Sequence, residues 1–409
     1  MPTIEHIRAA FPALDGDTVL LENAGGSQVP AGVVDAIRNH LLYDYCQLGA
    51  GYPASDRATD TVDRAHRFMN TFAGGDGIGS TILGSSSTSL MHMLATAIAP
   101  SIRPGDEIVV CEQGHEANVG CWLGLEERGA VVRWWTVDPE SGSLDLDDLR
   151  EVLGPRTRIV AFPHVSNLLG EIVDVEAATR LVHEIGGRVV VDGVAFAPHR
   201  AIDVEAWKTD FYVWSTYKVF GPHMAAMFGT NAAIAELRGP NHFFIPNDEV
   251  PYKFELGGAS HEGCAGLCAL APYLGMLAGR DNVDADTCER TTIEDAFETI
   301  TDLERPVQER ILERLDAHRD VRIVGPVDAD TDIRVSTISF THARISAGKI
   351  SGEAHRLGFG IRNGHMYAHR LCERLGIPLE DGVVRISPVH YNTTSEIDRL
   401  FDGLDGFMS

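Results

Sequence analysis

Short apolar runs alternate with segments of helical spacing between about residue 80 and residue 230. The strands expected there are EIVVCE (107–112), AVVRWWT (130–136), RIVAFPH (158–164), RVVVDG (188–193) and FYVWS (211–215). The intervening segments HEANVGCWLGLEERG, LDLDDLREVLG and DVEAATRLVHEIGG place apolar residues at helical intervals and end at glycines. This alternation is typical of a parallel sheet with crossover helices, and nearly continuous apolar strands indicate that both faces are covered.

The pattern changes after about residue 270. A long helical stretch, TIEDAFETITDLERPVQERILERLDAH, is followed by short strand-like runs in RVSTISFTH and GVVRIS, which predict a smaller α+β domain. We therefore expect an N-terminal segment of residues 1–20, a large α/β domain of residues 21–270 and a small α+β domain of residues 271–409.

Composition narrows the choice of partner. The chain has 409 residues, of which 44% are hydrophobic, and its 59 acidic and 34 basic residues give a formal net charge of -25. Such a charge repels nucleic acid and anionic membranes, so a small molecule is the expected partner. The start MPTIEHIRAAFPAL lacks the pattern of a signal peptide, and no apolar run reaches membrane-spanning length, so we expect a cytoplasmic protein.

The seven cysteines lack CxxC spacing, which argues against a disulfide framework or a zinc knuckle. Cys264 and Cys268 lie four residues apart in an apolar stretch, where the spacing favours small core residues on one helix face.

Polar residues follow several of the predicted strands. His115, Asn167, Asp192, Ser215 and Lys218 all lie at or just after a strand end. Ligands of open α/β sheets bind beyond the carboxyl ends of the strands, so we expect these side chains to share one rim.

The segment LGSSSTSLMHMLATAI (83–98) leads from hydroxyl residues directly into an apolar helix. Backbone N–H groups at a helix start, together with serine hydroxyls, suit a phosphate, although an N-cap with spare serines explains the pattern equally well. The glycine-rich GGDGIGS (74–80) precedes a strand-like STIL, so we interpret it as a turn rather than a dinucleotide loop.

Asp192 ends a strand too apolar for a surface carboxylate, and Lys218 ends the next one. A lysine in such a run is either a snorkelling side chain or a chemically used amine. An aspartate for a pyridine nitrogen, a lysine for an aldehyde, a histidine and a hydroxyl-rich helix start together match a phosphorylated pyridine aldehyde. The combined order therefore favours the second interpretation and predicts pyridoxal 5′-phosphate as the cofactor.

Six segments carry a family resemblance: LENAGGSQVP, GHEANVGCW, HVSNLLGEIVDV, VVVDG, DFYVWSTYKVFGPH and GVVRISPVHYNT. The chain resembles, over essentially its full length, the class V aminotransferase family of fold type I pyridoxal-phosphate enzymes, and is most similar to the cysteine desulfurase-like branch. The resemblance implies a mostly parallel central sheet with helices on both faces and a smaller α+β C-terminal domain. It also implies a homodimer with its active site at the interface and an amino acid as substrate.

The resemblance implies roles on the cofactor side of the site. Lys218 would bind the cofactor aldehyde covalently, Asp192 would pair with the pyridine nitrogen, and His115 would stack on the ring. Asn167 would hydrogen-bond the ring hydroxyl. The residues that would hold the phosphate are Ser85, Ser86, Ser215 and Tyr217. Lys218 and His115 are the expected catalytic residues, while a simple helix cap is the structural alternative for His115.

On the substrate side, Arg385 matches the arginine that binds the substrate α-carboxylate, a bidentate task suited to a guanidinium. A surface strand position is its structural alternative. The further substrate-side candidates are Arg362, Tyr367, His365 and Gln28.

Two positions depart from the family at the cofactor. Ala195 stands where most relatives have a glutamine, which removes one donor near the ring. Gly258 stands where relatives commonly have a threonine that reaches the neighbouring subunit's phosphate, leaving that contact to the backbone, Ser260 or His261.

A third departure concerns the chemistry. Desulfurases carry a loop cysteine whose thiolate attacks sulfur, and Tyr367 occupies the matching position. Cys372 lies five residues further on, where core packing is the favoured interpretation. His365 and His369 have helical i, i+4 spacing, but no carboxylate or cysteine completes a metal site, so we expect no metal.

The first hypothesis is therefore a carbon–sulfur lyase that acts on cysteine or an S-substituted cysteine by β-elimination, without a persulfide residue. The second is an aminotransferase or an amino-acid epimerase of the same family. The third is a non-catalytic protein that retains the fold. The sequence alone decides neither the amino acid, the reaction among these, nor whether a partner protein accepts sulfur.

Overall fold

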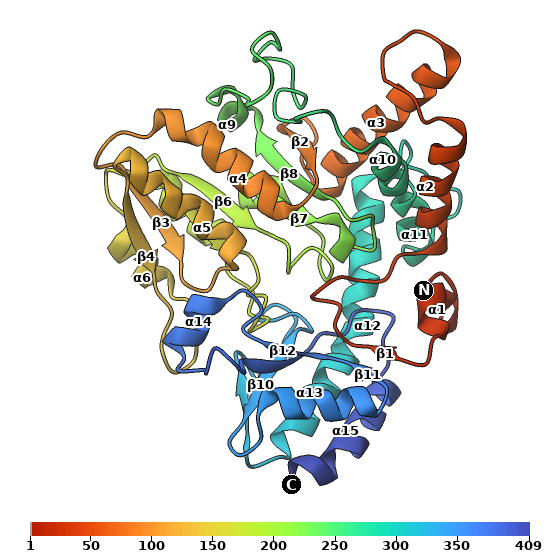
Figure 1. The fold of residues 1–409 in the computed structure, drawn as a ribbon, viewed down its shortest axis with the longest axis vertical. Helices are drawn as coiled ribbons and strands as arrows, with labels where there is room; N and C mark the ends of the chain where they lie inside the picture. Colours follow the sequence, from red (N-terminus) through yellow and green to blue (C-terminus); the bar gives the residue numbers. More distant parts are fainter. Residues whose placement is uncertain (1) are drawn as a thin grey trace.

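The computed structural model describes residues 2–409, and its centre is a seven-stranded sheet of order β2-β8-β7-β6-β5-β3-β4. The strand β8 is antiparallel to both neighbours, and the pairs from β7 to β4 are parallel. The strands are β2 (Gly79–Gly84), β3 (Glu107–Cys111), β4 (Val131–Trp135), β5 (Thr157–Pro163), β6 (Arg188–Asp192), β7 (Phe211–Ser215) and β8 (Ala225–Thr230) (Figure 1).

The five strands expected from the sequence are all present, with ends within one residue of those predicted. The predicted turn at 74–80 leads into β2. The strand β8 was not expected, because its sequence AAMFGT is poor in the β-branched residues that mark strands.

The single helix expected over HEANVGCWLGLEERG is wrong. The segment forms a short 3₁₀ turn (Glu116–Asn118), the helix α5 (Gly120–Leu123) and a second 3₁₀ turn (Gly124–Arg128). Glycine weakens a helix interior through its backbone entropy, and Gly120 and Gly124 each begin a new piece.

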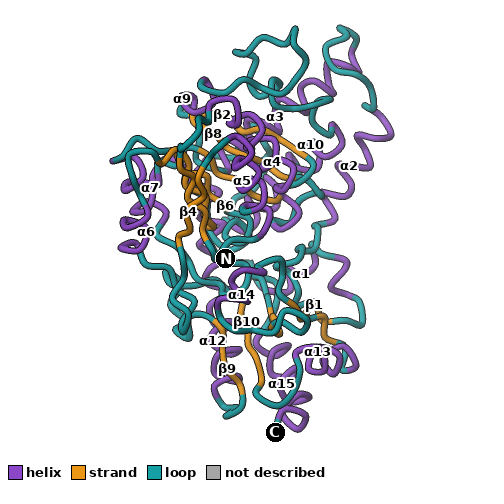
Figure 2. Tube along the Cα trace, turned by 60° about the vertical axis from the view of Figure 1, so that its left-hand side comes forward, coloured by secondary structure: helices purple, strands orange, loops and turns teal. Residues whose placement is uncertain are grey.

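Alternate side chains of the strands enter two cores, one on each face of the large sheet. Val189 and Val191 of β6 belong to one core, and Val190 belongs to the other. In Figure 2, α6 and α7 lie on one side of the strands and α4 and α5 on the other, so both faces are covered as expected. The first core includes α1 (Ile4–Ala9), α2 (Ala31–Tyr43), α3 (Pro53–Phe72), α6 (Leu146–Val152), α7 (Val175–Glu184), α8 (Val204–Trp207), α10 (His261–Cys268), α11 (Leu270–Leu277) and the start of α12 (Arg290–Asp316), and the second includes α4 (Ser87–Ile98), α5 and α9 (Asn231–Ala235).

A smaller antiparallel sheet of order β12-β13-β10-β9 forms the C-terminal region. The elements around it are β9 (Val321–Val324), β10 (Ile338–His342), α13 (Ala347–Arg356), β11 (Phe359–Gly360), β12 (Arg362–Gly364), α14 (His369–Arg374), β13 (Val383–Ile386) and α15 (Thr394–Met408). The N-terminal strand β1 (Val19–Leu20) pairs in parallel with β11 (Figure 1).

The predicted domain boundary at residue 271 stays a prediction. The helix α11 and the first half of α12 pack in the large core, and the second half of α12 packs in the C-terminal core. In the described residues, no helix is both long and apolar enough to cross a membrane.

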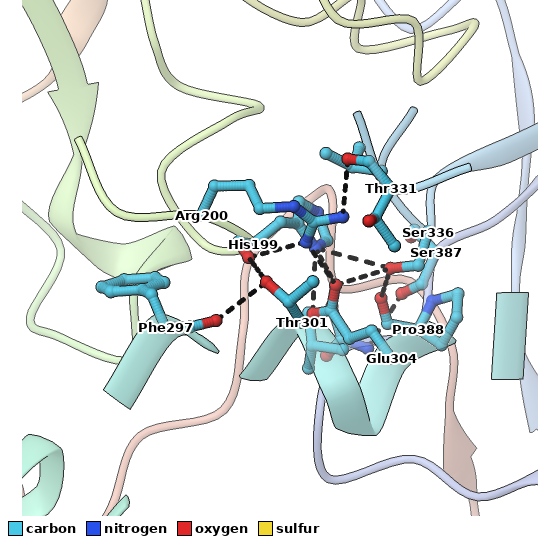
Figure 3. A network of polar contacts seen from close by, with 12 residues as sticks. His199, Arg200, Phe297, Thr301, Glu304, Thr331, Ser336, Ser387 and Pro388 are labelled. Carbon is cyan, nitrogen blue, oxygen red and sulfur yellow. Dashed lines mark hydrogen bonds and ion pairs between the residues drawn. The ribbon is translucent and has the colours of Figure 1, made fainter. Parts of the chain in front are cut away.

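A buried polar network joins the loop after β6 to the C-terminal region (Figure 3). His199 Nδ1 lies 3.0 and 2.9 Å from the two carboxylate oxygens of Glu304 on α12, and Arg200 Nη1 lies 3.6 Å from the same carboxylate. Ser336 Oγ lies 3.4 Å from Glu304 and donates a hydrogen bond of 2.8 Å to the Pro388 carbonyl. Because a buried carboxylate is stable only with such partners, the network holds the two regions in register.

Glu304→Ala tests this role. The substitution leaves buried His199 and half-buried Arg200 without their carboxylate, so we expect the free energy of unfolding to fall by about 3 kcal/mol. Urea denaturation followed by tryptophan fluorescence measures the change. Asp302→Ala, at an exposed position of the same helix, serves as the control and should change stability by less than about 0.5 kcal/mol. Equal effects at the two positions would mean that the network does not stabilise the junction.

Candidate active site

A pocket lies at the carboxyl ends of β5, β6 and β7, the rim that the sequence indicated. Five of the predicted site residues line it together: His115, Asn167, Asp192, Tyr217 and Lys218. Ala195, the position where a glutamine is usual, also lines this pocket. The alternation of strand and crossover therefore brings together residues that are far apart in the sequence.

Lys218 ends the 3₁₀ turn that follows β7, and its side chain is buried. Among residues 2–409 no hydrogen bond or ion pair holds its amine, which faces the pocket. Burial, followed by the charge of Arg385, lowers the pKa of Lys218 to about 8, while Asp192 and Glu22 oppose the shift. A substantial neutral fraction near physiological pH makes this amine a nucleophile and a base.

Asp192 ends β6 and is buried. Its Oδ1 accepts a hydrogen bond of 3.0 Å from the Val194 N–H. Burial raises the pKa of the Asp192 carboxyl, while that hydrogen bond and the Lys218 ammonium lower it. A carboxylate in this setting gains stability from a further cation or N–H donor placed in the pocket.

His115 combines the two roles that the sequence left as alternatives. Its Nδ1 accepts a hydrogen bond of 3.0 Å from the Ala117 N–H, which caps the first 3₁₀ turn, and its ring still lines the pocket. Burial, followed by the charges of Lys218 and Arg385, lowers the pKa of His115 to about 4. A neutral imidazole therefore faces the pocket at physiological pH.

The hydroxyl groups at the start of α4 divide into two sets. Ser86 caps the helix in a reciprocal arrangement with Ser89, and Ser85 is exposed. Ser87 and Thr88, which the sequence did not single out, line the pocket instead. The capping pattern itself was the available signal, because a cap at Ser86 places the next two residues in the first turn.

The other two phosphate candidates also lie near this helix start. Ser215 Oγ donates a hydrogen bond of 3.1 Å to Ser87 Oγ. The Tyr217 ring stacks on His223, with 4.6 Å between ring centroids and 8° between planes. His223 lines a second, more open pocket together with Ser85, Gly258 and Ser260, so the two pockets adjoin across this ring pair.

Arg385 lies on β13 and is buried. Its Nη1 donates a hydrogen bond of 3.0 Å to the Asn167 carbonyl, while its Nε is buried without a partner among the described residues. Asn167 Nδ2 donates to the Met366 carbonyl over 2.7 Å, and Asn167 Oδ1 likewise has no partner there. Burial lowers the pKa of Arg385 to about 10, and Glu22 opposes this shift.

The Tyr367 ring packs against the ring of His115, which lines the pocket. Met366 and Tyr367 both have positive φ, at 49° and 61°, a region that non-glycine residues seldom adopt. This turn presents the Tyr367 ring, 61% exposed, 5.1 Å from the His115 ring centroid. The Tyr367 carbonyl accepts a hydrogen bond of 2.9 Å from the Glu116 N–H, which holds the turn against the large sheet.

The remaining candidates lie further from the pocket. His365 Nδ1 accepts a hydrogen bond of 3.1 Å from the Tyr367 N–H, and Arg362 is exposed on β12. Gln28 donates its backbone N–H to the Tyr391 hydroxyl over 3.1 Å, and its side chain is not among the lining residues. Cys372 is buried in α14, where burial raises the pKa of its thiol to about 11, so core packing is confirmed.

The lowered pKa of Lys218 is directly testable. In the ligand-free protein we expect acylation of Lys218 to rise as the pH passes through about 8, because the amine loses its proton there. Peptide mass spectrometry over a pH series measures the modified fraction. Exposed Lys349 serves in the same digest as the reference for reagent access. A Lys218 profile that rises only near the ordinary lysine value would contradict this environment.

Comparison with known proteins identifies the family of this chain. The family described as "Aminotransferase class-V" matches residues 19–400. "Aminotransferase-like protein FGM3" of Gibberella zeae is 36% identical over 98% of both chains. "Cysteine desulfurase-like protein ustD" of Aspergillus flavus is 29% identical over 98% of this chain and 90% of its own. The solved cysteine desulfurase CsdA of Escherichia coli superposes with a TM-score of 0.83 at 25% identity, over 99% of this chain and 98% of its own.

A second solved structure, the cysteine desulfurase of Thermococcus onnurineus NA1, has a TM-score of 0.87 at 22% identity, covering 100% of this chain and 98% of that one. These likenesses confirm the predicted fold class. The chain therefore belongs to the class V aminotransferase family, a family of pyridoxal-phosphate enzymes that includes cysteine desulfurase-like members.

Proposed function

We propose that this protein is a pyridoxal-phosphate-dependent carbon–sulfur lyase that eliminates sulfur from cysteine or an S-substituted cysteine. The observation that carries the proposal is the buried amine of Lys218, which has no hydrogen-bond or ion-pair partner within residues 2–409 and shares a pocket with Asp192. A buried amine with a lowered pKa is suited both to bind an aldehyde and to accept a proton.

The residues of the pocket fit the cofactor. Asp192 would face the pyridine nitrogen and His115 the ring, while Asn167 Oδ1, buried without a described partner, would meet a polar ring substituent. The residues that would hold the phosphate are Ser87, Thr88, Ser215 and Tyr217, of which Ser87 and Thr88 replace the expected Ser85 and Ser86. Backbone N–H groups in the first turn of α4 add favourable dipoles for an anion.

When bound, the cofactor supplies an electron sink that lowers the barrier to breaking bonds at the substrate Cα. Arg385 would bind the substrate α-carboxylate through its Nε and Nη2 edge, because Nη1 is already held by Asn167. Lys218 Nζ would accept the Cα proton and deliver a proton to the departing sulfur. Neutral His115 closes one side of the pocket without placing a second cation beside Lys218.

The burial of Cys372 supports elimination rather than sulfur transfer. Cys372 is buried and its thiol has a raised pKa, so it supplies little thiolate, and the residue at the usual cysteine position is Tyr367, whose ring packs against His115. Without a thiolate to accept sulfur, cysteine and water would yield pyruvate, ammonia and hydrogen sulfide. An S-substituted cysteine would release the corresponding thiol.

An aminotransferase is the second candidate, because a relative at 36% identity is named as aminotransferase-like. Lys218 would then deliver the proton to a carbon of the cofactor instead of the departing sulfur. We also propose a homodimer, since Gly258 and Ser260, at the segment where relatives commonly contact the neighbouring subunit's phosphate, line the second pocket, which adjoins the first at the Tyr217 and His223 ring pair.

Product analysis separates these reactions. Incubation of the cofactor-loaded protein with a panel of S-substituted cysteines should produce pyruvate and thiol in equal amounts, without stoichiometric pyridoxamine phosphate. Chromatography of both products measures the ratio. If pyridoxamine phosphate formed without thiol, the protein would be an aminotransferase rather than a lyase. If a persulfide formed on Cys372, the reaction would be that of a cysteine desulfurase.

Lys218→Ala tests the central residue. We expect no cofactor adduct at position 218 after borohydride reduction, and turnover reduced by on the order of 10³-fold, because both the attachment point and the proton carrier are lost. Mass spectrometry of the reduced peptides detects the adduct. Lys349→Ala, an exposed lysine on α13, is the matched control and should retain both. An adduct on another lysine in the unaltered protein would show that Lys218 is not the residue that binds the cofactor.

A further inference from the structure

Glu22 lies between Arg385 and Arg362, two of the residues expected on the substrate side. It follows β1 and forms a bridge to Ser387, two residues beyond Arg385. Glu22 Oε1 lies 3.5 Å from Arg385 Nη2 and 3.4 Å from Arg362 Nη1. The sequence could not indicate this arrangement, because these partners lie 363 and 340 residues away along the chain.

The two arginines differ in burial. The Arg385 side chain is 4% exposed, whereas that of Arg362 is 55% exposed. A buried guanidinium requires a compensating negative charge, and a buried cation without one is strongly destabilising. Among residues 2–409, Glu22 is the carboxylate within ion-pair distance of Arg385.

The contact between Glu22 and Arg385 is nevertheless loose. At 3.5 Å it is longer than an ordinary N–H to oxygen hydrogen bond, and Arg385 Nε has no described partner. The Nε and Nη2 edge therefore has capacity for a better-placed carboxylate. A substrate carboxylate bound at this edge of Arg385 would lie next to the Glu22 carboxylate, and two like charges so close together repel each other.

We propose that Glu22 is a positioning residue that serves as the internal counter-ion of Arg385 and moves toward Arg362 when a substrate carboxylate binds. In the empty site, Glu22 compensates the buried guanidinium and keeps it oriented. In the occupied site, the solvent-exposed Arg362 receives the displaced carboxylate. Glu22 thus sets the affinity of the site for the α-carboxylate, and the inference rests on the proposed role of Arg385.

If Glu22 moves between the two arginines, Glu22→Gln and Arg362→Gln should have opposite effects on the affinity for a carboxylate ligand. Glu22→Gln removes the competitor, so a carboxylate should bind about tenfold more tightly, the ordinary size of a coupling between two sites. Arg362→Gln removes the receiving group and leaves Glu22 on Arg385, so a carboxylate should bind several-fold more weakly. In the double variant, Arg362→Gln should have little further effect, because no carboxylate remains to be received.

Propionate and propionamide are suitable ligands for the test, because neither carries an amine that reacts with the cofactor. Isothermal titration calorimetry with the cofactor-loaded protein measures their dissociation constants for each variant. Propionamide binding should be the same in all variants. Asp147→Asn and Arg150→Gln change the net charge equally at an exposed pair on α6 and should leave propionate binding unchanged.

Each outcome is decisive. Weaker propionate binding by Glu22→Gln would overturn the proposal, because it would mean that Glu22 only orders Arg385. The proposal would also be overturned if Arg362→Gln weakened propionate binding equally with and without Glu22. Arg362 would then act on the ligand through its own charge and not through Glu22. If the unaltered protein bound propionate no better than propionamide, the role of Arg385 would fail and the inference with it. If the protein clearly preferred propionate but Glu22→Gln left its affinity unchanged, the role of Glu22 would be wrong while the role of Arg385 would stand.

Discussion

The buried amine of Lys218 is the group around which the rest of the site is organised. The side chain lies at the carboxyl end of the large sheet, away from bulk water and without a hydrogen-bond partner in the described chain. Desolvation disfavours its charge, and the guanidinium of Arg385 acts in the same direction. Asp192 and Glu22 oppose this, so burial and one guanidinium act against two carboxylates, and the balance leaves the pKa of Lys218 at about 8.

The fold supplies this balance from separate elements. Asp192 ends β6 and Lys218 ends the turn after the parallel strand β7, whereas Arg385 comes from β13 of the C-terminal sheet and Glu22 from the segment after β1, which bridges to Ser387. The position of the C-terminal sheet therefore determines the electrostatic environment of Lys218. Buried contacts such as that of Glu304 with His199 keep the two regions at a constant separation (Figure 3). Their rigidity matters because charge interactions weaken rapidly as charges separate or become solvated.

The sequence predicted the large sheet well, since strands buried on both faces leave long apolar runs. It failed at β8, whose alanines and glycine lack a strand signature, and at residues 116–128, where glycines divide one helical pattern into three pieces. The rim residues His115, Asn167, Asp192 and Lys218 were found because each follows a recognisable strand. Ser87 and Thr88 lie two residues beyond the expected pair and were missed because the run of serines does not show by itself which of them caps the helix.

The sequence by itself determined the type of sheet, the order of the chemical groups along its rim and the family to which the chain belongs. These depend on local patterns and on the direction of the strands, which a linear chain already contains. Only the tertiary structure decided which hydroxyls enter the pocket, that Tyr367 leans on His115, and that Glu22 lies between Arg385 and Arg362. Those features depend on the packing of segments hundreds of residues apart, where burial and charge are properties of the assembled core rather than of any local stretch.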